Sequence, residues 1–261
     1  MLMLIWVILF SILGSVGAIL SAGAFLLFND KVQNTLIPCL ISYATGTLLA
    51  TAFLGMIPHA IEHAIENITV IEQVNQNISL ILATILIGLI VFFVLEKLII
   101  WRHCHVTNCE VHGAPGPIIL IGDSFHNLID GIIIASSFLI SFAMGIAVSL
   151  SVIAHEVPQE VGDFGILLDQ DYSKKKALFY NTLSGSSTIP AAIISYFILD
   201  VTKAAIPYIL AFSAASFIYI ALSDLYPELQ HRNIELKHTL RQFLLMMAGI
   251  GTMILVFQVH I

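Results

Sequence analysis

Long apolar runs divide the chain into eight segments, and each is long enough to cross a bilayer as a helix. A hydrocarbon core about 30 Å thick needs about 20 apolar residues at a rise of about 1.5 Å per residue. The pattern therefore predicts an all-α polytopic membrane protein that forms a single membrane domain over residues 1–261. The eight predicted spans cover approximately residues 2–28, 36–57, 79–100, 118–140, 142–168, 177–199, 206–227 and 242–260.

Polar residues interrupt the fourth and fifth segments near their middles. A charged group in hydrocarbon costs several kcal/mol, so such groups are rare and usually functional. In each segment the polar residues recur with helical periodicity, which places them on one face of a helix. The fourth segment carries Asp123, His126, Asn127 and Asp130, and the fifth carries His155, Glu156, Gln159, Glu160 and Asp163.

The depth of these residues follows from the turn between the two segments, which we place near Ser141. His126 lies 15 residues before this turn and His155 lies 14 residues after it. At about 1.5 Å per residue, each histidine sits roughly 21–22 Å from the turn. An antiparallel helix pair therefore brings both histidines to one depth, and we expect the two polar faces to point toward each other, away from lipid.

Composition supports a membrane protein and excludes some partners. The chain is 58% hydrophobic and 10% charged, whereas a soluble domain has about 25% charged residues. A net charge of −7 with ten lysines and arginines offers no basic surface for nucleic acid. Three cysteines do not indicate a disulfide framework. The first segment lacks a positively charged start and is too long for a signal-peptide core, so we interpret it as a retained helix.

Basic residues predict the orientation, because cytoplasmic connections are enriched in lysine and arginine. Nine of the ten basic residues fall in the odd-numbered connections between spans. Those connections are therefore expected in the cytoplasm, with both termini on the non-cytoplasmic side. The plasma or inner membrane is the expected location, with an organelle membrane as the alternative.

Two further groups of polar residues lie near predicted helix ends. His59, Glu62 and His63 form one stripe at the outer end of the second span, followed by Glu66. This stripe is either a cation-attracting funnel or a solvated helix end. Asp224, near the inner end of the seventh span, either belongs to an inner exit or only caps the helix.

The connection over about residues 101–117 is rich in potential metal ligands. Imidazole and thiolate together suit zinc or another soft divalent ion, but the spacing matches no closed zinc finger. We interpret the loop as a flexible cytosolic metal-binding segment, with an incidental polar loop as the alternative. Its candidate ligands are His103, Cys104, His105, Cys109 and His112.

The central polar faces offer imidazoles, carboxylates and amides. Mixed nitrogen and oxygen ligands suit zinc, iron(II), manganese and cobalt, and suit copper(I) poorly. They are not the all-oxygen cage expected for magnesium or calcium. The candidate metal ligands are His126, Asn127, Asp130, His155, Glu156, Gln159 and Glu160, and Asp123 and Asp163 extend the polar path.

Three kinds of protein fit this arrangement: a metal-ion transporter, an intramembrane zinc-dependent hydrolase and a proton-only carrier. A zinc protease would use HExxH, in which two histidines bind the metal. Here the sequence HEVPQ puts Gln159 at the second histidine position, and Pro158 distorts the turn. A proton carrier would not need so many metal ligands. We therefore favour a transporter over an enzyme, with the hydrolase as the alternative.

The central motifs resemble those of the ZIP (Zrt/Irt-like) family of zinc and iron permeases. HNLIDG is similar to the family's HNxxDG in the fourth span, and HEVPQEVGD to the HExPHExGD of its HExPHE-type branch in the fifth. IPHA in the second span and AASFIYIALSDLYPE in the seventh also look similar. The resemblance implies eight helices in a 3+2+3 inverted repeat, with spans four and five at the centre, and a homodimer.

The resemblance also implies roles for individual residues. It makes His126, Asp130, His155 and Gln159 the ligands of a primary transport site, beside a second site lined by Asn127, Asp130, Glu156 and Gln159. Glu160 and Asp163 would continue the path inward. Two positions depart from the family pattern: Gln159 replaces a histidine found in many relatives, and Ile189 precedes Pro190 where some relatives have a carboxylate.

These observations predict a membrane transport domain that carries divalent metal ions across the lipid bilayer into the cytoplasm. The expected cargo is Zn²⁺, with Fe²⁺, Mn²⁺ and Cd²⁺ as further candidates. No cofactor other than the transported ion is expected.

Overall fold

The computed structural model describes residues 2–25, 27–66, 68, 70–101, 116–169, 172–201, 203–230 and 236–258, and the regular elements in these ranges are all helical. The α-helices are α1 (Leu2–Ile12), α2 (Ala18–Phe25), α3 (Asp30–Ala50), α4 (Ile57–Ile65), α5 (Ile71–Trp101), α6 (Gly116–Ile140), α7 (Phe142–Asp169), α8 (Lys174–Gly185), α9 (Thr188–Val201), α10 (Ile206–Tyr219), α11 (Tyr226–Gln230) and α12 (Leu236–Gln258). Three π-helical turns, η1 (Leu13–Gly17), η2 (Thr51–Met56) and η4 (Ile220–Leu225), and one 3₁₀ turn, η3 (Lys203–Ala205), connect some of them.

The all-α prediction is confirmed. Among the described residues, seven helical stretches are long and apolar enough to cross a membrane. The predicted span 118–140 corresponds to α6, which is not one of the seven because its central polar residues lower its hydropathy. With 25 residues, α6 is about 37 Å long and could still span the bilayer. The count of eight spans and the inverted repeat therefore stay predictions.

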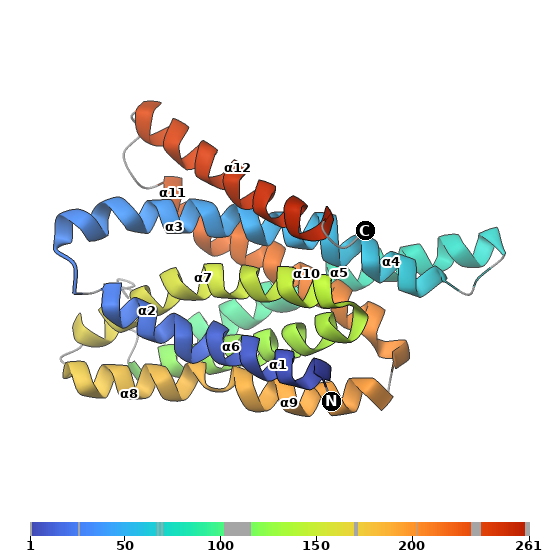
Figure 1. Cartoon of the computed structure of the whole chain (residues 1–261), viewed down its shortest axis with the longest axis horizontal. Helices are drawn as coiled ribbons and strands as arrows, with labels where there is room; N and C mark the ends of the chain where they lie inside the picture. The colour runs from blue at the N-terminus through green and yellow to red at the C-terminus, as the bar shows by residue number, and fades with distance from the viewer. Residues whose placement is uncertain are drawn as a thin grey trace.

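The helices run roughly along one axis, with α6 and α7 inside the bundle (Figure 1). α7 packs on α2, α3 and α6, and α6 packs on α1, α9 and α10. α8 and α9 follow one side of the bundle, while α12 crosses the other side over α3 (Figure 1). The N-terminal end of α1 and the C-terminal end of α12 lie toward the same end of the molecule as α4 (Figure 1). The two central polar helices are thus packed against helices on several sides.

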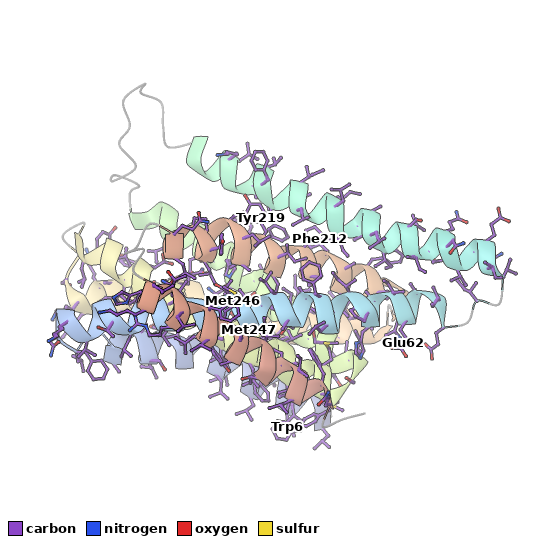
Figure 2. The ribbon with its side chains drawn as sticks, turned by 90° about the horizontal axis from the view of Figure 1, so that it is seen from above. Trp6, Glu62, Phe212, Tyr219, Met246 and Met247 are labelled. Carbon is purple, nitrogen blue, oxygen red and sulfur yellow. The ribbon has the colours of Figure 1, made fainter. Side chains whose placement is uncertain are left out.

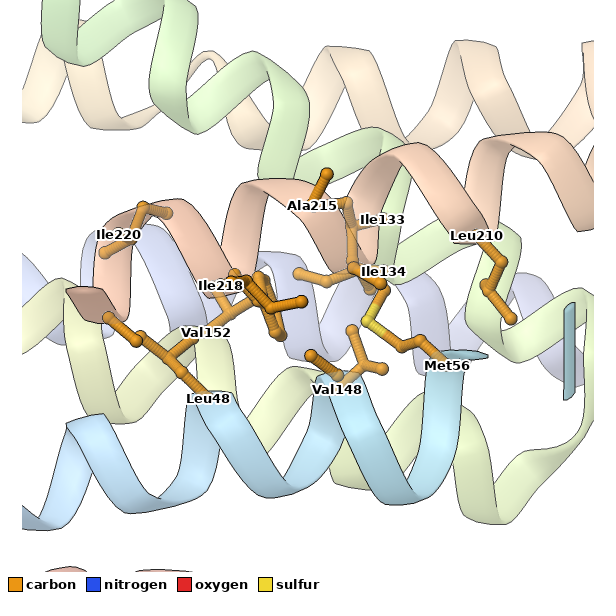
Figure 3. Packing of buried hydrophobic residues seen from close by; sticks show 14 of the residues in the cluster. Leu48, Met56, Ile133, Ile134, Val148, Val152, Leu210, Ala215, Ile218 and Ile220 are labelled. Atoms are coloured by element: carbon orange, nitrogen blue, oxygen red, sulfur yellow. The ribbon is translucent and has the colours of Figure 1, made fainter. Parts of the chain in front are cut away.

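The main core lies where α3 and η2 meet α6, α7 and α10 (Figure 3). Leu48, Met56 and Val148 are fully buried there, together with Ile133 and Val152 (Figure 3). Lipid tails are as apolar as these side chains, so helix association in a membrane depends on close packing rather than on transfer from water. A second contact joins α5 to α10, where the Phe92 ring lies 5.1 Å from Phe212 and 6.2 Å from Tyr219; Figure 2 labels the latter two.

Glycines permit the closest helix contacts. A Cβ on Gly131 of α6 would meet the backbone oxygen of Thr188 and would lie 2.8 Å from the backbone nitrogen of Ala192 in α9. A Cβ on Gly249 of α12 would similarly meet the backbone oxygen of Tyr43 in α3. Small residues at such crossings let two backbones touch. The α6–α9 contact therefore brings the sixth predicted span against the polar face of the fourth.

Several spans are irregular. The sixth span breaks at Ser186 and Ser187, between α8 and α9, which agrees with the softening that its serine-rich sequence predicts. The second span continues as helix to Ile65, beyond the predicted limit of 57. In the second and seventh spans, η2 and η4 end two residues before Pro58 and Pro227, respectively. The periodicity of the sequence did not predict these π-helical turns.

Candidate metal centre

A one-residue turn joins α6 to α7. α6 ends at Ile140, α7 begins at Phe142, and the Ser141 hydroxyl accepts a hydrogen bond from the Met144 N–H at 3.1 Å. The predicted turn is thus confirmed, and so is its geometric consequence. The Nε2 atoms of His126 and His155 lie 3.1 Å apart, which means that the two histidines share one depth.

Four side chains converge around these two atoms. The ligand atoms of His126, Asp130, His155 and Glu156 all lie within 4.8 Å of one another. His155 Nε2 is 3.3 Å from Asp130 Oδ2 and 3.6 Å from Glu156 Oε1. His126 Nε2 is 3.4 Å from the same Glu156 oxygen and 3.9 Å from Asp130 Oδ2. This group of four is called the histidine cluster below.

The backbone selects the tautomer of His155. Its Nδ1 lies 2.9 Å from the carbonyl oxygen of Ser151, one turn earlier in α7. A carbonyl only accepts hydrogen bonds, so the neutral ring carries its proton on Nδ1 and keeps a lone pair on Nε2. This lone pair points into the histidine cluster. Metal-binding histidines commonly have such a partner on the other ring nitrogen, because it fixes both tautomer and orientation.

The electrostatics of the histidine cluster favour a cation. Asp130, His155 and Glu156 are completely buried. Both carboxylate oxygens of Asp130 and of Glu156 lack a hydrogen-bond partner in the described part of the chain. Buried carboxylates without partners are costly, and a bound divalent ion would offset that cost. Two imidazoles with two carboxylates suit zinc and its neighbours among the divalent transition metals.

A second group of carboxylates adjoins the first. Ligand atoms of Asp123, Glu156 and Glu160 also lie within 4.8 Å of one another, and all three residues are buried. Glu156 therefore belongs to both groups. Asp123 and Glu160 both lie farther from the Ser141 turn than the two histidines, so the second group is displaced toward the opposite end of the bundle. It is called the carboxylate cluster below.

The two amides of the predicted site form hydrogen bonds within it. Asn127 donates from Nδ2 to Asp123 Oδ1 at 2.9 Å, and its Oδ1 accepts from the Thr188 hydroxyl at 2.8 Å. Gln159 donates from Nε2 to Asp123 Oδ1 at 3.4 Å. Both amides thus orient a carboxylate, and their predicted role as metal ligands stays a prediction. Asp163 lies farther along α7 and is partly buried.

The stripe of His59, Glu62 and His63 lies in α4 (Ile57–Ile65), where Glu62 is exposed (Figure 2). His63 Nδ1 is 3.5 Å from Glu66 Oε2, and His59 Nδ1 is 3.0 Å from the carbonyl oxygen of Gly55. His63 and Glu66 border a cavity of about 580 Å³ that reaches the end of α6 and the start of α10. The stripe is therefore helical and accessible, as predicted, and both interpretations of it stay open.

Some of the predicted site residues lie outside the part of the chain that the structure describes. His103, Cys104, His105, Cys109 and His112 lie among residues 102–115, which the structure does not describe. Asp224 falls in η4, but its side chain is not described. The roles predicted for these residues therefore stay predictions.

The contribution of the sixth span to the site was not predicted from the sequence. Asn181 of α8 donates from Nδ2 to the Glu160 carboxylate, and Thr188 at the start of α9 donates to Asn127. Both residues are completely buried. Their spacing of seven residues was the available signal, because it places both on one helix face.

The fold and the site together define a polytopic membrane protein with metal-ligand clusters in the interior of its helix bundle. Comparison with known proteins gives the family. The model of the ZIP zinc transporter family matches residues 101–256, which is more than half of the chain. The chain therefore belongs to the ZIP family and is a multi-pass integral membrane protein.

Relatives within this family are named as zinc transporters and not as enzymes. Zinc transporter ZIP10 of Danio rerio is 34% identical over 152 residues, covering 55% of this chain and 18% of the relative. Zinc transporter foi of Drosophila melanogaster is 36% identical over 147 residues, covering 56% and 21%, respectively. Zinc transporter zipt-7.2 of Caenorhabditis elegans is 36% identical over 141 residues, covering 52% and 30%. The match thus spans less than a third of each relative's length.

Proposed function

We propose that this protein transports divalent metal ions, zinc above all, across a membrane and into the cytoplasm. The observation that carries the proposal is the convergence of His126, Asp130, His155 and Glu156 in the bundle interior. Imidazole nitrogens together with carboxylate oxygens are ligands that suit zinc and neighbouring divalent transition metals. Fe²⁺, Mn²⁺ and Cd²⁺ share enough of that chemistry to be further candidates.

Binding would proceed by replacement of the ion's water shell. His155 offers Nε2 as a lone pair, and Asp130 and Glu156 supply negative charge that neutralises the dication. His126 is the most accessible of the four, with a side chain 19% exposed, so it would meet an arriving ion first. Inward release would follow a rearrangement of α6 and α7 against the surrounding helices, as alternating access requires.

Residues outside the histidine cluster would assist the movement of the ion. The stripe of His59, Glu62 and His63, in which Glu62 and His63 are exposed, would attract cations at the outer mouth. The connection over about residues 101–117 would bind metal on the cytoplasmic side, and both termini would face outward. We further propose that the protein resides in the plasma or inner membrane. We also propose that it forms a homodimer.

The hydrolase alternative is less well supported. Gln159, at the second-histidine position of a zinc-protease motif, donates its amide hydrogen to Asp123 instead of offering an imidazole. The named relatives are transporters. Without a second histidine at this position, the site has no zincin-like geometry.

Metal uptake into proteoliposomes tests the proposal. His155→Ala and Asp130→Ala each remove a ligand of the histidine cluster, and we expect both variants to insert normally but to lose saturable zinc uptake. His238→Ala, near the start of α12 and remote from the centre, is the matched control and should retain uptake. Wild-type flux in the Asp130 and His155 variants would refute the site assignment. Stoichiometric metal binding without any uptake would favour the hydrolase.

Deletion of residues 103–112 tests the proposed loop function in the same assay. We expect a changed apparent affinity for zinc with little change in maximal uptake, because the central site remains intact. A linker of glycine and serine of equal length is the control for shortening of the connection. Complete loss of uptake in the linker variant would contradict this role.

A further inference from the structure

The Ser151 side chain of α7 lies where three helices meet. Its hydroxyl oxygen is 2.5 Å from the hydroxyl oxygen of Thr51, the first residue of η2, and 3.4 Å from the Thr47 carbonyl oxygen of α3. The same hydroxyl is 3.5 Å from the Met253 sulfur of α12. These four residues are at most 1% exposed. One side chain of α7 thus makes polar contacts with both α3 and α12 in the interior of the bundle.

Apolar side chains surround this polar contact. The second span contributes Leu48 and Ala52, and α7 contributes Val148 and Val152. All four are completely buried in the main core, part of which Figure 3 shows. A hydrogen bond is stronger in such surroundings than in water, and an unpaired hydroxyl is more costly there. The Ser151 contact is therefore a fixed point between α7 and its neighbours.

Ser151 also holds a member of the histidine cluster. Its carbonyl oxygen accepts a hydrogen bond from His155 Nδ1 at 2.9 Å, so its hydroxyl fixes α7 while its carbonyl fixes the imidazole. Just beyond His155, α7 is weakened by Pro158, which has no N–H to donate to the Ala154 carbonyl. His155 lies between the fixed point and this weakened turn. Its position therefore depends on contacts that come from other helices.

Two π-helical turns, η1 and η2, pack against α7 in this region. η2 begins at Thr51 itself. η1 contributes Gly14, where an added Cβ would lie 3.2 Å from a methyl group of Val152. On a third side, the Phe217 ring of α10 lies 5.8 Å from the His155 ring. π-helical turns within α-helices are frequent at functional sites. Here they place a hydroxyl and a close helix contact next to the residues that precede His155.

We propose that Ser151 is a positioning residue of the metal centre, whose contact with Thr51 sets the position of His155 and thereby the affinity of the histidine cluster. Its hydroxyl faces α3 and α12, so it acts on the ion through His155 and not as a ligand. Ser151 lies nearer to the Ser141 turn than His155 does, on the side away from the carboxylate cluster. The inference rests on the proposed transport function. It adds that helices without a ligand in the histidine cluster help to determine how tightly the ion is held.

The contact separates binding from movement. In the proposed mechanism α6 and α7 rearrange against the surrounding helices, and the Ser151–Thr51 contact joins α7 to one of these. Loss of the contact would leave His155 less well placed but would not hinder the rearrangement. The KM for zinc should therefore rise without a fall in maximal uptake. A general packing defect would instead lower maximal uptake per inserted protein.

Cd²⁺ binding to the purified full-length chain and zinc uptake into proteoliposomes test the proposal together. Isothermal titration measures the Cd²⁺ affinity. We expect Ser151→Ala to weaken Cd²⁺ binding and to raise the KM for zinc by about tenfold, the lower end of the effect of removing a partner of a metal ligand. Ser149→Ala is the matched control, because Ser149 is equally buried on α7 but its hydroxyl donates to the Gly145 carbonyl within the same helix. It should leave the Cd²⁺ affinity and the KM unchanged.

Thr51 provides a second test of the same contact. Thr51→Val keeps the shape of the side chain but removes the hydroxyl, so it should weaken Cd²⁺ binding as Ser151→Ala does. Thr51→Ser retains the hydroxyl and should bind Cd²⁺ as the wild type does. The double variant should bind no more weakly than either single variant, because both changes remove one contact. If Ser151→Ala fails to fold, the two Thr51 variants decide the question.

An unchanged Cd²⁺ affinity in both Ser151→Ala and Thr51→Val would overturn the positioning role. An equal loss in Ser149→Ala, or a fall in maximal uptake at constant KM, would also overturn it. Because Cd²⁺ binding is measured without flux, the two proposals can fail separately. Cd²⁺ binding that depends on Ser151, without zinc uptake by the wild type, rejects transport alone. Normal uptake with unchanged Cd²⁺ affinity in the variants rejects the positioning role alone.

Discussion

Replacement of Gly131 by alanine should destabilise the contact between α6 and α9. The added Cβ would meet the Thr188 backbone oxygen and would approach Ala192 N to 2.8 Å and Ala191 Cβ to 2.9 Å. Two of these neighbours are backbone atoms, which cannot rotate away as a flexible side chain could. Relief therefore requires the two helices to separate.

The expected magnitude combines two opposing effects. Overpacking of a tight contact costs about 1–3 kcal/mol, while alanine gains about 0.5–1 kcal/mol over glycine within a helix. We expect a net loss of about 1–2 kcal/mol. For a chain of this size, each kcal/mol lowers the melting temperature by about 2–4 °C, so the variant should melt roughly 2–8 °C lower.

Gly251→Ala is the matched control, because a Cβ at Gly251 would have no neighbour within 4 Å. It should keep or slightly raise the melting temperature. Thermal unfolding of both purified variants in one detergent, followed by near-ultraviolet circular dichroism, makes the comparison. Equal melting temperatures for the Gly131 and Gly251 variants would refute the close-contact interpretation.

Two further predictions concern the same centre. Thr188→Val keeps the shape of the side chain but leaves the Asn127 amide oxygen without its 2.8 Å donor. We expect the free energy of unfolding to fall by about 1–3 kcal/mol, measured by thermal unfolding. A stability equal to that of a Thr182→Val control would contradict this prediction. Zinc uptake should weaken as pH falls, because metal binding needs neutral imidazole and ionised carboxylate. An apparent KM for zinc that stays constant between pH 7.5 and 5.5 would argue against the histidine cluster as the binding site.

The centre of the fold could be predicted because its geometry is local. Two helices joined at Ser141 are related by a simple count of residues, and that count brought His126 and His155 to one depth. The periodicity of polar residues then selected the faces that meet. Both steps use only helical rise and rotation, and the 3.1 Å separation of the two Nε2 atoms confirms them.

The contribution of α8 could not be predicted in the same way. Asn181 meets Glu160 across 21 residues and a change of chain direction, so the contact depends on how α8 packs against α7. A single asparagine in a span rich in serine and threonine resembles any other helix-softening residue. Likewise, nothing in the apolar pattern of the second and seventh spans distinguishes a π-helical turn from an α-helical one.

The π-helical turns η2 and η4 are positions at which a helix can lose one residue and remain a helix. In each, the residue after the turn donates its N–H to a carbonyl five residues back, from Ile57 to Ala52 and from Tyr226 to Ala221. Such a turn holds one residue more than the α-helical turn it replaces. Loss of one residue there would restore a regular helix and keep the faces on both sides in register. Homologous chains can therefore differ by a single residue inside these two spans, and an alignment that forbids gaps within transmembrane helices would misassign every position beyond them.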